Sequence, residues 1–93
     1  MAVGIRMKLL GGSVADIDRL NAVIDPDGDP PAGLLFHASG PIDGGIGVID
    51  FWESREAYDR FAQERIGPAM ATAGIAGQQP EIHEFAVHEH FPR

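Results

Sequence analysis

Hydrophobic and other residues alternate along positions 2–10, which is the pattern of a β-strand with one buried face. The hydrophobic set is Val3, Ile5, Met7 and Leu9, and the residues between them are Gly4, Arg6 and Lys8. β-Branched and aromatic residues are concentrated over 34–39, 46–52 and 81–91, between segments rich in glycine and proline. We therefore predict three further strands over these ranges.

The segment 14–24 carries hydrophobic residues at helical spacing and predicts the first α-helix. Ser13 precedes it and can accept a hydrogen bond from a free backbone N–H of the first turn. Asp16 follows three residues later, in the place of the acidic residue of a capping box. Asp25-Pro26 is expected to end the helix, because the residue before a proline avoids the helical conformation.

A second helix is predicted directly after the third strand, from the cap residue Ser54 to residue 73. One row along it is hydrophobic and consists of Tyr58, Ala62, Ile66 and Met70. Gly67-Pro68 interrupts this segment, and a proline cannot donate to the helical hydrogen-bond ladder. We therefore predict a kink or a restart of the helix at that dipeptide.

The element order β-α-β-β-α-β is the split βαβ pattern of the ferredoxin-like fold. It predicts one α+β domain over 1–93, with a four-stranded antiparallel sheet and both helices on one of its faces. A chain of this length has a thin core, and the other sheet face has nothing to cover it. We therefore predict a homodimer that forms through this helix-free face.

Alternation along each strand assigns side chains to the two faces of the sheet. Ile49, Phe51 and Phe85 are assigned to the helices. The charged and aromatic residues then expected on the helix-free face are Arg6, Lys8, His37, Asp50, Trp52, Glu84 and His88. The apolar residues expected there are Leu35, Val48 and Ala86. On this assignment, Val48→Asp would place an unpaired charge between two sheets and break the dimer.

The mixed set of polar residues on one face suggests a ligand pocket. His37 is the candidate proton shuttle because imidazole titrates near neutral pH, and Asp50 would orient it. Arg6 would hold an anionic or enolate oxygen of the ligand, and Trp52 and His88 would contact the ligand. The alternative interpretation is an ordinary solvated or interfacial sheet face, with Arg6 paired to Asp50 across adjacent strands.

Two histidines in the order His88-x-His90 would point the same way on a strand and could chelate a metal ion. A third ligand would have to come from His37, Asp50 or Glu84, and no motif fixes it. The other interpretation is that these are polar residues near the end of the chain. We therefore predict no metal and no other cofactor.

Composition narrows the classes of partner. The chain carries 14 acidic and 7 basic residues, for a net charge of −7, which argues against binding nucleic acid or an anionic membrane. It has no cysteine, so a disulfide and a thiolate nucleophile are excluded. There is no long apolar run and no signal-peptide pattern, so a cytoplasmic location is expected.

The element order and the segment Phe51-Trp52-Glu53-Ser54-Arg55-Glu56-Ala57 resemble the dimeric α/β-barrel superfamily, and most closely its antibiotic-biosynthesis-monooxygenase-like branch. In that branch a Trp-x-Ser-x-Glu-Ala segment is often followed by a histidine four residues after the alanine. Here that position is Phe61. The resemblance implies a dimer whose two sheets face each other, with a ligand cavity in each protomer.

Members of this superfamily include cofactor-independent oxygenases, haem degraders, lactone isomerases and proteins without known activity. The resemblance therefore implies a small-molecule enzyme, and a cofactor-independent monooxygenase on an aromatic or polyketide-like substrate is the first hypothesis. The second is a non-catalytic ligand-binding or structural dimer. The third is a protein that binds haem through one of its histidines.

Overall fold

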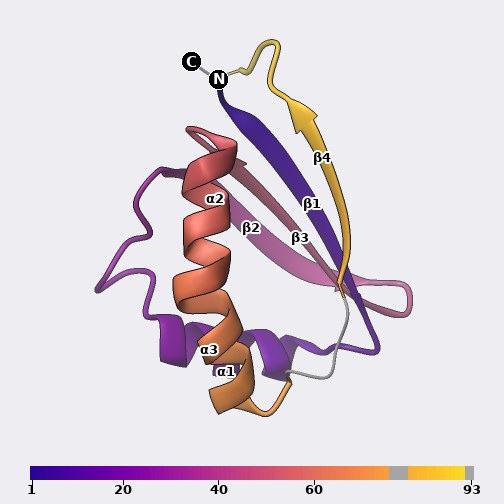
Figure 1. Ribbon diagram of the computed structural model, residues 1–93. Helices are drawn as coiled ribbons and strands as arrows, with labels where there is room; N and C mark the ends of the chain where they lie inside the picture. The colour runs from indigo at the N-terminus through magenta and orange to yellow at the C-terminus, as the bar shows by residue number, and fades with distance from the viewer. Residues whose placement is uncertain (76–79, 92–93) are drawn as a thin grey trace.

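The computed structural model describes residues 1–75 and 80–91 and has the predicted order of strands and helices (Figure 1). The elements are β1 (Val3–Leu10), α1 (Val14–Ile24), β2 (Leu34–Ile42), β3 (Gly45–Trp52), α2 (Arg55–Phe61), the π-helical turn η1 (Ala62–Ile66), α3 (Gly67–Ala73) and β4 (Glu81–Ala86). The sheet is antiparallel in the order β2-β3-β1-β4, which is ferredoxin-like. All helices lie on one face of it (Figure 1).

Both helix starts are capped as the sequence predicts. The Ser13 hydroxyl accepts from the backbone N–H of Asp16 at 3.3 Å, and the Asp16 carboxylate accepts from the backbone N–H of Ser13 at 3.0 Å. These two bonds form a complete capping box. The Ser54 hydroxyl accepts from the backbone N–H of Ala57 at 3.1 Å. Free N–H groups of both first turns are therefore satisfied by side chains.

The long helix is interrupted near Gly67-Pro68, as predicted, but the chain never leaves the helical conformation. The backbone N–H of Gly67 donates to the carbonyl of Ala62, five residues back, which is a π-helical bond. Pro68 has no N–H, so it cannot supply the α-helical bond at the next position. The wider turn therefore takes the place of a sharp kink, and α3 starts with Pro68 in its first turn.

The strand registers correct the predicted faces. Ile5 lies opposite Asp50 and Val3 lies opposite Trp52, and residues directly opposite each other in a ladder share a face. Val48, Asp50 and Trp52 therefore face the helices, and their assignment to the helix-free face was wrong. All three are buried.

The same correction applies to β2 and β4. A bulge between Leu34 and Phe36 places Phe36 opposite Phe51 on the helix-free face, while His37 lies opposite Asp50 on the helix face. In β4, Glu84 lies opposite Ile5, so it faces the helices, as does Ala86 opposite Val3. The predicted sides of His37, Glu84 and Ala86 were therefore wrong, and Leu35 lies unpaired at the bulge.

The helix-free face instead presents an aromatic row. The ring centroids of Phe36 and Phe51 are 6.1 Å apart, and those of Phe51 and Phe85 are 6.3 Å apart. The ring of Phe85 lies over Gly4, where an added Cβ would be only 2.4 Å from a ring atom. Glycine at this position therefore lets an aromatic side chain from the edge strand cover the neighbouring strand. Arg6 and Lys8 point to this same face, as predicted.

Candidate functional site

A cavity of about 280 Å³ lies between the sheet and the helices, on the face opposite the aromatic row. Its walls come from β1, β2, β3, β4 and all the helical segments, and most of them are hydrophobic. The lining side chains with a polar atom are Asn21, His37, Asp50, Trp52 and Tyr58. A largely apolar cavity with a few convergent polar groups is the usual form of a small-molecule site.

The candidate proton shuttle His37 is paired with Asp50 inside this cavity. His37 Nδ1 lies 2.5 Å from Asp50 Oδ1. The Asp50 side chain is only 4% exposed, whereas that of His37 is 40% exposed. A buried carboxylate needs partners, and the indole N–H of Trp52 supplies a second, longer bond of 3.4 Å to Asp50 Oδ2. The predicted orientation of His37 by Asp50 is therefore present in the geometry.

The pair determines which histidine nitrogen can exchange protons. An ionised carboxylate can only accept, so Nδ1 of His37 carries the shared proton and Nε2 is left to accept another. The hydrogen bond to Asp50 raises the pKa of His37 above its ordinary value of 6.5, with partial burial opposing the shift. Because the ring is partly exposed, it can pass that proton to solvent.

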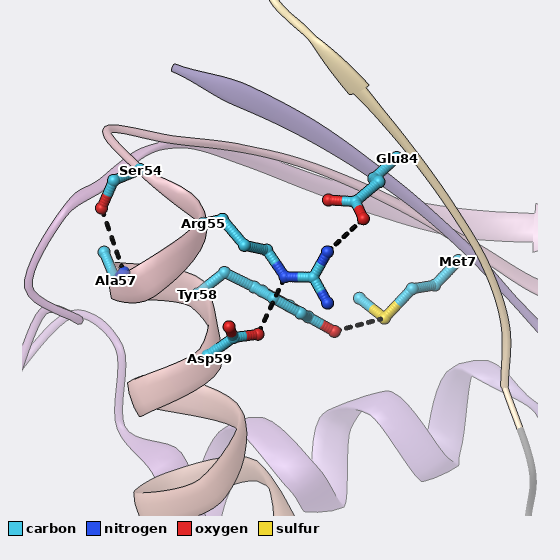
Figure 2. Close-up of polar contacts among 7 residues, drawn as sticks. All are labelled: Met7, Ser54, Arg55, Ala57, Tyr58, Asp59 and Glu84. Atoms are coloured by element: carbon cyan, nitrogen blue, oxygen red, sulfur yellow. Dashed lines mark hydrogen bonds and ion pairs between the residues drawn. The ribbon is translucent and has the colours of Figure 1, made fainter. Parts of the chain in front are cut away.

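Tyr58 is a polar member of the site that sequence reasoning treated only as part of a hydrophobic row. It is 6% exposed, and its hydroxyl lies 4.0 Å from the sulfur of Met7, which is a weak acceptor (Figure 2). Burial raises the pKa of Tyr58, and the negative charge of Asp50 adds to the effect. The hydroxyl therefore stays protonated and is available as a donor to a ligand oxygen. Its helical spacing alone could not separate it from the core residues around it.

The other predicted ligand-binding residues divide between the two sides of the sheet. Trp52 is fully buried and lines the cavity. Arg6 is on the helix-free face, as predicted, and does not line this cavity. It lies opposite Ile49 and not Asp50, so the alternative ion pair with Asp50 is not formed. His88 lies beyond the end of β4 and is exposed, which separates it from the cavity lining.

The strand geometry expected for His88 and His90 is absent, because β4 ends at Ala86. The expected strand over 81–91 was therefore too long, although the backbone N–H of Val87 still donates to the carbonyl of Ala2. Within 1–75 and 80–91, no group of three histidine, aspartate or glutamate side chains could hold a metal ion. Over the same residues, no helix combines the length and hydrophobicity that a membrane span needs.

Comparison with known proteins gives matches to solved structures alone, because no protein-family model and no curated protein matches the chain. SnoaB, a cofactor-independent oxygenase from Streptomyces nogalater, is similar with a TM-score of 0.65 at 21% identity, covering 99% of this chain and 97% of that one. Rv0793 from Mycobacterium tuberculosis is similar with a TM-score of 0.72 at 17% identity, covering 98% and 99%.

A third similar structure is a Caulobacter crescentus CB15 protein provisionally named an antibiotic biosynthesis monooxygenase. Its TM-score is 0.68 at 16% identity, and the match covers 95% of this chain and 91% of that one. At these identities the likeness establishes the fold. The chain has the ferredoxin-like fold of the antibiotic-biosynthesis-monooxygenase-like proteins, and the resemblance in layout predicted from the sequence is confirmed.

Proposed function

We propose that this protein is a small-molecule enzyme that oxygenates an aromatic or polyketide-like substrate without a cofactor, and that the cavity between sheet and helices is its active site. The observation that carries the proposal is the His37–Asp50 pair at the wall of an otherwise hydrophobic cavity. Such a pair can remove a proton from a bound organic molecule, and the hydrophobic walls keep water from the resulting anion.

The reaction begins when His37 Nε2 takes a proton from an acidic C–H of the substrate. Tyr58 donates a hydrogen bond to the carbonyl oxygen on which the negative charge develops. The sequence predicted this role for Arg6, which lies on the other face of the sheet. The anion transfers electrons to molecular oxygen, a C–O bond forms, and the peroxide takes the proton back from His37. Loss of water then breaks the O–O bond, so a CH₂ group and O₂ become a C=O group and H₂O.

The similarity to SnoaB supports this proposal through the fold, since that protein is a cofactor-independent oxygenase. The size of the cavity also supports it. A volume of about 280 Å³ is close to the lower end of the 300–1,000 Å³ typical of small-molecule pockets, so a compact ring system is the expected ligand. The rings of Tyr58 and Phe61 pack at 5.8 Å and 5.1 Å from that of Trp52, and these aromatic walls would stack on such a ligand.

Oxygen uptake with a panel of phenolic ring compounds that carry an acidic CH₂ group beside a carbonyl tests the proposal. We expect uptake with at least one compound, and a loss of about 10²- to 10⁴-fold in His37→Gln, the range for removal of a general base. His88→Gln, which makes the same change at an exposed histidine outside the cavity lining, is the matched control and should retain most of the rate. If no compound in the panel causes oxygen uptake while some of them still bind in the cavity, the protein is a non-catalytic ligand-binding protein and the proposed activity is wrong.

The homodimer is a separate part of the proposal. Phe36, Phe51 and Phe85 form a row on the helix-free face, and Phe36 and Phe85 are 54% and 46% exposed in the single chain. Pairing of two such faces would remove them from water, and an obligate interface of this kind buries about 2,000 Å² or more in total. Light scattering should give twice the chain mass of 10.0 kDa, and a stable monomer at micromolar concentration would contradict the dimer.

A further inference from the structure

The cavity crosses the whole sheet from β2 to β4. His37, Asp50, Ile5 and Glu84 lie opposite one another in the strand registers and form one row on the helix face. His37 lies at the β2 end of the row, where it lines the cavity and also reaches solvent. Ile82 lines the cavity on β4 and is 47% exposed. The cavity wall therefore includes a partly exposed side chain at each end of the sheet, on β2 and on β4.

One ion pair joins α2 to β4 next to the cavity residue Tyr58. The guanidinium of Arg55, at the start of α2, donates to the Glu84 carboxylate on β4. Its Nε atom donates to Asp59 at 2.9 Å, and the guanidinium carbon lies 5.9 Å from the ring centre of the cavity residue Tyr58. Figure 2 shows the Arg55 side chain reaching from the helix to Glu84 above Tyr58 and Met7. The pair thus joins α2 to the edge strand β4 beside Tyr58, which lines the cavity, whereas Arg55 and Glu84 lie just outside the lining.

The ion pair is weak enough to open. The side chains of Arg55 and Glu84 are 48% and 45% exposed. Ion pairs between exposed side chains add little stability and are screened by salt. β4 is the edge strand next to β1, and its residues are all exposed. Phe85 packs on the helix-free face, so few packed side chains resist movement on the helix face of this strand.

We propose that the gap between α2 and β4 is an entrance to the cavity and that the Arg55–Glu84 ion pair closes it. The entrance serves the ligand site that the proposed function assigns, and it is separate from the polar mouth at His37. Opening needs only the separation of two exposed side chains. Opening the entrance does not require the hydrogen bond between His37 and Asp50, on the other side of the cavity, to break.

The accessibility of Trp52 to acrylamide tests the entrance. Trp52 is the only tryptophan of the chain, is fully buried and lines the cavity, so collisional quenching of its fluorescence reports entry of a small neutral molecule. Glu84→Ala should raise the quenching constant about two- to fivefold, the range expected for loss of an exposed ion pair. Sodium chloride at about 1 M should raise it in the wild-type protein and leave Glu84→Ala unchanged.

Asp59→Ala is the matched control, because it removes the other partner of Arg55 and leaves the pair with Glu84 intact. Its quenching constant should equal that of the wild type, and Arg55→Ala should behave like Glu84→Ala. An unchanged constant in folded Glu84→Ala, or an equal rise in Asp59→Ala, overturns the proposal. Thermal unfolding and the Trp52 emission maximum identify any variant that fails to fold. Acrylamide is no substrate, so this result is independent of whether the protein oxygenates anything.

Discussion

Asp50 Oδ1 lies 2.5 Å from Nδ1 of His37, across the ladder between β2 and β3. The carboxylate is almost fully buried, while the imidazole is partly exposed to solvent. The buried Asp50 carboxylate is thereby connected to the His37 imidazole, which can carry protons between the cavity and water.

Asp50→Asn should lower the pKa of His37, because the neutral amide cannot stabilise the imidazolium as a carboxylate does. If His37 is the base, the rising limb of the pH–rate profile should move to lower pH, and the maximal rate should fall because the weaker base removes the proton less well. An NMR titration of the His37 ring protons measures the pKa directly. A pKa equal to that of the wild type would show that the bond between the two residues is not formed in solution.

The stability of the protein should fall as the pH rises above neutrality. The pKa of His37 is raised in the folded state, so its stabilising contribution is complete below the unfolded value of about 6.5 and is lost as the pH passes through the folded value. Thermal unfolding of the wild type and His37→Gln between about pH 5.5 and pH 8.5 measures this effect. The difference between the two midpoints should shrink toward high pH, and a constant difference would contradict the linkage.

Tyr58→Phe should change the free energy of unfolding by less than about 1 kcal/mol, because among residues 1–75 and 80–91 the hydroxyl bonds to nothing but the weakly accepting thioether of Met7. The same change should lower the turnover number of the folded protein markedly, since it removes the hydrogen-bond donor to the ligand oxygen. Calorimetry and oxygen uptake on the same samples separate the two effects. A strongly destabilised variant would mean that the hydroxyl has a structural partner in the folded protein.

Phe36→Asp and Val48→Asp distinguish the two faces of the sheet. Phe36 belongs to the exposed aromatic row, so a charge there should give folded monomers. Val48 is in the core beside Leu9 and Ile46, so an unpaired charge there should cost about 3 kcal/mol or more and unfold the chain instead of splitting a dimer. Light scattering measures the oligomeric state of both variants, and circular dichroism measures whether they are folded. Folded monomers of Val48→Asp would contradict the strand register.

The sequence was enough to predict the element order and the helix starts, because these depend on neighbours in the chain. Ser13 with Asp16 and Ser54 with the N–H three residues later form the expected bonds. The pairing of His37 with Asp50 could also be predicted, since both were assigned to one face. Local spacing is informative wherever the partners come from the same or adjacent strands.

The choice of face could not be read from the sequence, because β3 is hydrophobic on both sides. Ile49 and Phe51 have the composition of core residues but lie on the helix-free face, whereas Asp50 is a charged residue in the core. Its burial depends on donors from His37 and Trp52 that only the folded sheet brings together. The bulge after Leu34 adds a shift of one residue that no alternation pattern reveals.

The π-helical turn η1 also fixes the number of residues between α2 and α3. Each residue of a regular α-helix turns the next side chain by about 100°, so an extra residue in one turn resets the phase of everything after it. Ala69 is buried and Met70 lines the cavity in the present phase. Deleting one residue within 62–66 would rotate both away from these positions while leaving α2 in place. The residue count of this turn is therefore as much a determinant of the shape of the cavity as the side chains that line it.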